Sequence, residues 1–146
     1  MRKYISIAAL IILFISISVN IVSANERTVS PSSHRILIDG RPVALLAYNI
    51  DGNNFFRLRD LAFVLSQTGS QFDIGWNAAA NVITITTRRE YIAIGSEMNL
   101  AAAQNSIATP TAANIQIDGA AKSLTGFLID GSNFFYVAGA GRIAEL

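Results

Sequence analysis

The sequence predicts an α+β fold, in which a small antiparallel β-sheet packs on one short helix. Apolar runs separated by Asp-Gly dipeptides are typical of β-hairpins, and one stretch has the apolar spacing of a helix. An internal repeat predicts that this unit is duplicated, with the second copy incomplete. A chain of 146 residues suffices for one domain, or for one small unit and part of another.

The first 24 residues have the anatomy of a secretory signal peptide. Met1–Tyr4 is short and positively charged, residues 5–22 are mostly apolar, and Val22-Ser23-Ala24 resembles a cleavage site. We therefore expect cleavage after Ala24 and a secreted or cell-surface protein, with residues 25–34 as a lead-in. The alternative is an uncleaved membrane anchor, because about 18 apolar residues approach the length that spans a bilayer.

The repeat sets the organisation of the rest of the chain. Ile36–Gly40 recurs as Ile115–Gly119, at an offset of 79, and 11 of the 21 positions from 36 to 56 are identical between the copies. The stretch between the copies is rich in Ala, Thr, Ser and Asn, which indicates a linker. The predicted organisation is one unit at residues 35–98, a linker at 99–112, and a partial second unit at 113–146.

Each copy contains two Asp-Gly dipeptides beside apolar runs, which predict two-residue hairpin turns. The predicted turn residues are Asp39, Gly40, Asp51, Gly52, Asp118, Gly119, Asp130 and Gly131. A two-residue turn at Asp51 places Tyr48 opposite Phe55, and the repeat places Phe127 opposite Phe134. Aromatic pairs of this kind stabilise a hairpin by roughly 0.2–1 kcal/mol.

A short helix is predicted after the first of these hairpins. Leu58, Leu61, Val64 and Leu65 fall on one helical face, and Asp60 lies in the first turn, where a carboxylate suits the helix dipole. Thr68-Gly69 is the predicted end of the helix.

Three further strands are predicted after the helix. Phe72, Ile74 and Trp76 alternate and share one face, residues 82–86 are rich in β-branched side chains, and Tyr91–Ile94 has strand composition.

These residues carry a resemblance to a known family. The motifs are Ile36-x-Ile-Asp-Gly, Ala47-Tyr-Asn-Ile-Asp-Gly-Asn-Asn-Phe-Phe-Arg-Leu-Arg-Asp-Leu-Ala62, Gln71-Phe-Asp-Ile-Gly-Trp-Asn77 and Val82-Ile-Thr-Ile85. They resemble the copper amine oxidase-like N-terminal domain, a stalk module of exported proteins in Gram-positive bacteria. The first copy resembles it over residues 35–98, and the second only through Phe135.

The resemblance implies a non-catalytic stalk or interaction module at the cell surface, without amine oxidase activity. In the family's oxidases the stalks of two subunits meet, which implies self-association. Oxidase chemistry would need three histidines on copper, whereas this chain has the single histidine His34, placed in the serine-containing lead-in. The second copy has Tyr136-Val-Ala-Gly139 where the first has Arg57-Leu-Arg-Asp60, so it lacks the basic motif before the helix.

Composition excludes several further classes of function. The chain has no cysteine, which excludes disulfides and thiolate chemistry. Without Arg2 and Lys3 of the leader, 9 basic residues face 10 acidic ones, so the net charge is near −1 and lacks the signature of a nucleic-acid binder. Asp51, Asn53 and Asn54 offer too few carboxylates for calcium. We expect no cofactor, no metal and no catalytic residue.

Two interaction hypotheses remain open. An incomplete second unit would leave an open sheet edge, and an unpaired edge invites self-association. Alternatively, Tyr48, Phe55 and Trp76 form an exposed aromatic platform for a cell-wall polymer, although their alternation is also that of a core face.

Overall fold

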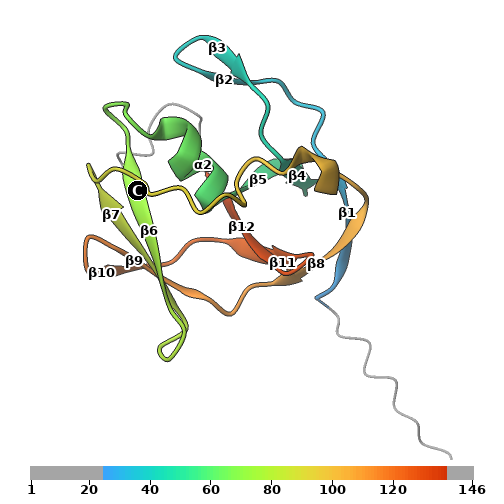
Figure 1. Ribbon diagram of the computed structural model, residues 1–146. Helices are drawn as coiled ribbons and strands as arrows, with labels where there is room; N and C mark the ends of the chain where they lie inside the picture. The colour runs from blue at the N-terminus through green and yellow to red at the C-terminus, as the bar shows by residue number, and fades with distance from the viewer. Residues whose placement is uncertain (1–24, 138–146) are drawn as a thin grey trace, which may run out of the picture.

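The computed structural model describes residues 25–137, and this part of the chain is mostly β with one short helix (Figure 1). It contains a closed six-stranded antiparallel barrel, a four-stranded sheet and a separate two-stranded hairpin. The predicted signal peptide lies outside the described residues, as do residues 138–146 of the second copy. Within residues 25–137, no helix has the length and apolar character needed to cross a membrane.

The barrel is built from three strands of each copy, in the order β1-β4-β5-β12-β11-β8. The strands from the first copy are β1 (Arg27–Pro31), β4 (Ala47–Ile50) and β5 (Asn53–Arg57). Those from the second copy are β8 (Ser106–Pro110), β11 (Gly126–Ile129) and β12 (Ser132–Tyr136). Each bound in the second set equals its counterpart plus 79, so the repeat also includes β1 and β8, which share a single identity in sequence, Pro31 with Pro110.

The two halves of the barrel are related by an approximate two-fold axis. Where β1 meets β8, Thr28 pairs with Ile107, its own repeat equivalent. Where β5 meets β12, Phe56 pairs with Phe135, again its equivalent. Both junctions are antiparallel and centred on equivalent residues, which is the pattern of a self-complementary interface. The second copy is therefore completed in the barrel by the first.

Alternation along the strands gives the barrel an interior distinct from its outer face. The interior is apolar and comprises Val29, Leu46, Tyr48, Ile50, Phe55, Ala108, Phe127, Ile129 and Phe134. The predicted hairpin registers are confirmed, with Tyr48 opposite Phe55 and Phe127 opposite Phe134. Close ring contacts nevertheless run between the copies: Tyr48 packs edge-on against Phe134 at 5.1 Å, and Phe55 against Phe127 at 5.2 Å. Interleaving of the rings joins the two copies into one core.

A second core lies outside the barrel, between the four-stranded sheet and the helix. The sheet has the order β10-β9-β7-β6, with β6 (Phe72–Asn77), β7 (Val82–Thr87), β9 (Asn114–Ile117) and β10 (Ala120–Lys122). Its apolar face, the helix and the barrel's outward-facing Phe135 bury one cluster, which includes Leu61, Phe72, Ile85 and Ile115. In this sheet β7 and β9 run parallel, whereas the sequence predicted antiparallel strands alone.

The helix α2 (Leu58–Leu65) begins where predicted and ends earlier than predicted, before Thr68-Gly69. Leu58, Leu61 and Leu65 are buried, and Val64 is half-buried beside them. Eight residues make a helix that is marginal alone, so burial against the sheet and the barrel stabilises it.

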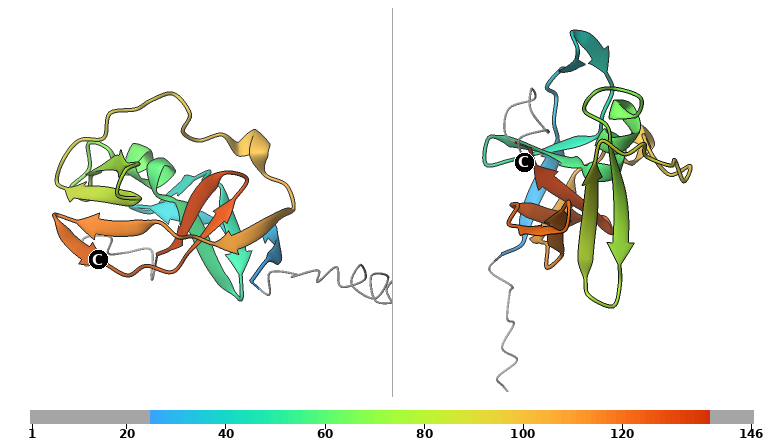
Figure 2. Two further views of the ribbon diagram at one scale, coloured as in Figure 1. Left: turned by 90° about the horizontal axis from the view of Figure 1, so that it is seen from below. Right: turned by 90° about the vertical axis from the view of Figure 1, so that its left-hand side faces the viewer.

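The hairpin of β2 (Ile36–Ile38) and β3 (Arg41–Val43) joins neither larger sheet. It projects from the body of the molecule in Figure 1 and in the right-hand view of Figure 2.

Three sequence-based assignments need correction. The expected lead-in at residues 25–34 contains β1, and the expected linker at 99–112 contains a 3-10 turn, η1 (Leu100–Ala102), and β8. Their composition is typical of loops, but pairing with distant strands makes them barrel strands. The predicted strand at Tyr91–Ile94 is wrong: this segment has no regular structure. It belongs to a long connection that crosses over α2 (left-hand view of Figure 2).

Candidate functional site

A groove of about 390 Å³ lies where the barrel, the four-stranded sheet and the start of α2 meet. Its lining comes from four segments that are far apart in sequence. They are the start of α2 (Arg57, Leu58, Arg59, Asp60), the sheet (Ile74, Gly75, Trp76, Ile83), the connection over the helix (Ser96, Asn99) and the β11–β12 hairpin (Gly131, Ser132, Asn133, Phe135).

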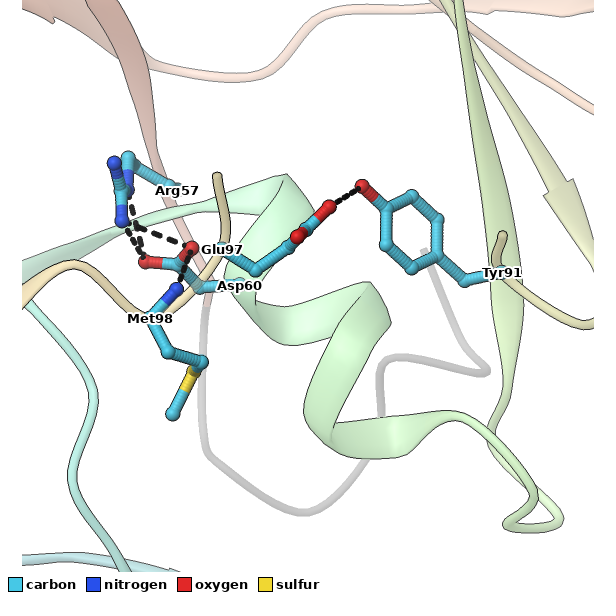
Figure 3. Close-up of polar contacts among 5 residues, drawn as sticks. All are labelled: Arg57, Asp60, Tyr91, Glu97 and Met98. Atoms are coloured by element: carbon cyan, nitrogen blue, oxygen red, sulfur yellow. Dashed lines mark hydrogen bonds and ion pairs between the residues drawn. The ribbon is translucent and has the colours of Figure 1, made fainter. Parts of the chain in front are cut away.

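A buried ion pair forms one wall of the groove (Figure 3). Asp60 is 1% exposed, and its two carboxylate oxygens accept hydrogen bonds from Arg57 Nε at 2.8 Å and Nη2 at 3.0 Å. The carboxylate also accepts the backbone N–H of Met98 at 3.1 Å. The Asp60 carboxylate thus accepts three hydrogen bonds, and the one from Met98 fixes the connection to the start of α2.

A second group of hydrogen bonds, centred on Glu97, holds the same connection together (Figure 3). Glu97 accepts hydrogen bonds from the Tyr91 hydroxyl at 2.5 Å and from the N–H groups of Ile94 and Gly95, both at 2.8 Å. Partial desolvation opposes ionisation, but these hydrogen bonds outweigh it and hold the pKa of Glu97 at about 2. Desolvation, together with the Glu97 contact, raises the pKa of Tyr91 far above its ordinary value. Residues 91–98 are thereby fixed over the helix.

Two side chains that line the groove, Trp76 and Arg59, are exposed and could contact a ligand. Trp76 is 51% exposed although the alternation of its strand is that of a core face, because burial decreases along β6 from Phe72 to Asn77. Arg59, at the start of α2, is exposed and also lines the groove. An open indole face, a guanidinium and nearby amide and hydroxyl groups suit a polyhydroxylated or anionic ligand.

The predicted aromatic platform is wrong for two of its three residues. Tyr48 and Phe55 are 1% and 4% exposed, and both point into the barrel. The Tyr48 hydroxyl donates to the carbonyl of Gln104 at 3.1 Å. Their positions were ambiguous in the sequence because a buried barrel face and an exposed platform share the same alternation, so only Trp76 is accessible to a ligand.

The four predicted Asp-Gly turns are confirmed in their geometry. Each has positive φ at both central residues, from 47° to 52° at the aspartates and from 75° to 82° at the glycines. This is the type I′ turn, whose twist matches that of the flanking strands. The eight turn residues are Asp39, Gly40, Asp51, Gly52, Asp118, Gly119, Asp130 and Gly131.

Three of the turn aspartates have an additional role in tertiary contacts. Asp51 forms an ion pair with Arg27, and the repeat-equivalent Asp130 accepts a hydrogen bond from Ser106, the equivalent of Arg27. Asp118 binds the N–H and the hydroxyl of Thr87. The aspartates lie at separate turns and do not converge on one site.

His34 lies exposed before β2, with its Nδ1 2.9 Å from the Ser32 hydroxyl. Between residues 25 and 137, no three histidine, aspartate or glutamate side chains gather as metal ligands would.

Sequence reasoning missed the groove because its walls are assembled from distant segments. Ser96 and Asn99 carry no motif, and the stretch around Asn99 was expected to begin a linker. In the sequence, Arg59 stood out only as part of the basic motif before the helix. The one usable signal was the Trp76 side chain at the end of its strand.

Comparisons with protein-family models, curated proteins and solved structures find no match for this chain. Its function is therefore inferred from the geometry and the sequence.

Proposed function

We propose that this protein is a non-catalytic module of the cell surface, serving as a stalk or interaction domain. The resemblance to the copper amine oxidase-like N-terminal domain and the signal-peptide pattern support this assignment. One structural observation carries it further: both copies share a single closed barrel, so the repeat builds one rigid body. The charged side chain that is deepest in the groove, Asp60, is fully engaged in a structural ion pair.

The test is to express the full chain in a Gram-positive host and to fractionate medium, wall, membrane and cytoplasm. We expect a mature chain that begins at Asn25 and is retained at the surface. A photo-crosslinker on the exposed Leu37 should give discrete crosslinked species. A chain recovered from the cytoplasm with its leader, or released as free monomer without crosslinks, would contradict the proposal.

The second candidate is a cell-wall glycan-binding module, favoured by the exposure of Trp76 over the groove. In this function the indole covers the apolar face of a sugar ring, and Arg59 binds a carboxylate or phosphate on the polymer.

Sedimentation with purified peptidoglycan, with and without attached anionic polymer, tests this candidate. Trp76→Ala should weaken binding about tenfold, as expected for an aromatic anchor. Phe63→Ala is the matched control, because Phe63 is 43% exposed and lies outside the groove. Equal binding by the two variants would exclude the groove as the glycan site.

A further inference from the structure

The β2–β3 hairpin is the part of the described chain whose environment differs most from that of its repeat equivalent. Its counterpart, β9–β10, joins the four-stranded sheet, whereas β2 pairs only with β3 among residues 25–137. The two hairpins share the sequence Ile-x-Ile-Asp-Gly and the type I′ turn. The second copy therefore provides a template for what this hairpin binds.

In that template, β9 docks on β7 as a parallel strand with a defined end. The N–H groups of Asn114 and Asp118 donate to the carbonyls of Asn81 and Ile85, at 3.0 and 2.9 Å. Beyond the last pair, the Asp118 carboxylate accepts the N–H of Thr87 at 2.9 Å and its hydroxyl at 2.7 Å. The carboxylate of the turn aspartate thus accepts hydrogen bonds from a hydroxyl-bearing residue at the end of the neighbouring strand.

Burial indicates that β2 lacks the corresponding cover. Ile115 and Ile117 of β9 are 3% and 6% exposed, while the equivalent Ile36 and Ile38 are only half-buried. Leu37 of β2 is 46% exposed, at the position where β9 has Gln116. Three consecutive apolar residues on a strand whose outer edge is unpaired in the described structure favour the addition of another strand.

The hairpin offers one suitable edge. Pro42 of β3 has no N–H to donate, which weakens that edge. On β2, the residues equivalent to the donors Asn114 and Asp118 are Arg35 and Asp39. Both residues are exposed in the described structure.

A strand that binds β2 should differ from β7 in charge, because β2 begins beside an arginine that β9 lacks. Arg35 occupies the position of Asn114, which lies opposite Val82 in the template. A carboxylate at the Val82 position of an incoming strand would pair with Arg35.

We propose that the outer edge of β2 binds an extended segment of another polypeptide as a parallel β-strand. The segment carries an acidic residue opposite Arg35, then alternating β-branched residues, then a threonine or serine that binds the Asp39 carboxylate. This inference rests on the proposed interaction function and assigns its partner class. Main-chain hydrogen bonds supply the affinity, and the two charged positions supply the direction and register.

The probe is a synthetic peptide of residues 79–89 carrying glutamate at the Val82 position, added to the mature chain of residues 25–146. Hydrogen exchange read by NMR should show new protection at Leu37 and Asp39, and not at the β6 or β10 edges. Protection of β6 or β10 instead would overturn the assignment of β2. Protection of β2 that grows with protein concentration in the absence of peptide would overturn the choice of a separate partner in favour of a second copy.

Two matched controls test the geometry. In the template, carbonyls of odd-numbered residues of β7 face β9, so N-methylation at positions 83 and 85 of the peptide should abolish binding, and N-methylation at 84 and 86 should not. The reverse result would exclude the proposed orientation.

The second control is in the protein. Asp39→Asn should weaken binding about tenfold, because a neutral amide oxygen accepts a weaker hydrogen bond than a carboxylate does. Asp51→Asn, at an equivalent type of turn away from β2, should leave binding unchanged. Equal effects of the two variants would contradict the role of Asp39. Failure of the peptide to bind would remove the β2 proposal alone, since surface retention is measured independently of it.

Discussion

The two copies of the repeat use the same hairpins in different surroundings. The β4–β5 and β11–β12 hairpins are equivalent in register, in turn geometry and in their place in the barrel. The β2–β3 and β9–β10 hairpins have equally similar sequences, but only the latter belongs to a larger sheet. Local sequence thus determines that a hairpin forms, while its membership of a sheet depends on which strands the rest of the chain brings beside it.

The largest test of barrel equivalence is the removal of one interior ring from each copy. Phe55→Ala and Phe134→Ala should each lower the free energy of unfolding by about 3–5 kcal/mol, because both rings are buried and contact an aromatic ring of the other copy. Urea denaturation with fluorescence detection checks this. A loss confined to one of the two variants would break the two-fold description.

The next test concerns a feature described for the first copy alone. Asp60→Ala leaves Arg57, whose side chain is 16% exposed, without its carboxylate. We expect a loss of about 3 kcal/mol and faster exchange at the amide of Met98. A loss within experimental error would mean that the ion pair does not hold the connection over α2.

A smaller test concerns a place where the equivalent hairpins differ in packing. A Cβ at Gly126 would lie 2.5 Å from Cδ1 of Phe135, whereas the equivalent position already holds Ala47. Gly126→Ala should destabilise the fold by about 1–3 kcal/mol through overpacking. The matched exchange Ala47→Gly should cost less, about 0.5–1 kcal/mol. Thermal unfolding of the two variants gives the ranking, and an inverted ranking would contradict the packing difference.

The smallest expected effect is a difference between the β9–β10 and β2–β3 hairpins in how their turn aspartates change the pH dependence of stability. The bonds from the Thr87 N–H and hydroxyl lower the pKa of Asp118 below its ordinary value of 3.8. A depressed folded-state pKa stabilises the fold above the unfolded-state pKa, and this contribution is lost as the pH falls through the folded-state value.

Stability measured between pH 6 and pH 2 should therefore fall less steeply in Asp118→Asn than in the parent chain. Asp39→Asn is the matched variant, because Asp39 lies at the equivalent turn of the β2–β3 hairpin, which pairs with no other strand in the described structure. Identical profiles for the two variants would show that the β7–β9 contact adds no proton-linked stability.

The features that could be predicted from sequence are those set by neighbouring residues. An Asp-Gly turn fixes the register of its own hairpin, so Tyr48 opposite Phe55 followed directly from the chain. The face of α2 followed from the spacing of Leu58, Leu61 and Leu65.

The features that could not be predicted depend on contacts between the copies. β8 has an unremarkable composition and becomes a strand because β1 and β11 flank it. Trp76 shares the face of the buried Phe72, but burial decreases toward the end of β6 and leaves its ring exposed. The groove exists where these long-range contacts meet, so the separate motifs that line it do not reveal it along the sequence.

The closure of the barrel by β8 and β12 has a consequence for the order of folding. β1 is made first but pairs with a strand about 80 residues later, so contacts of high sequence separation dominate this domain. Until the second copy is synthesised, the first can present only half a barrel with two unpaired edges. The barrel can therefore close only after β12, near the end of the described residues, has been made. Duplication thus places completion of the native fold late in synthesis.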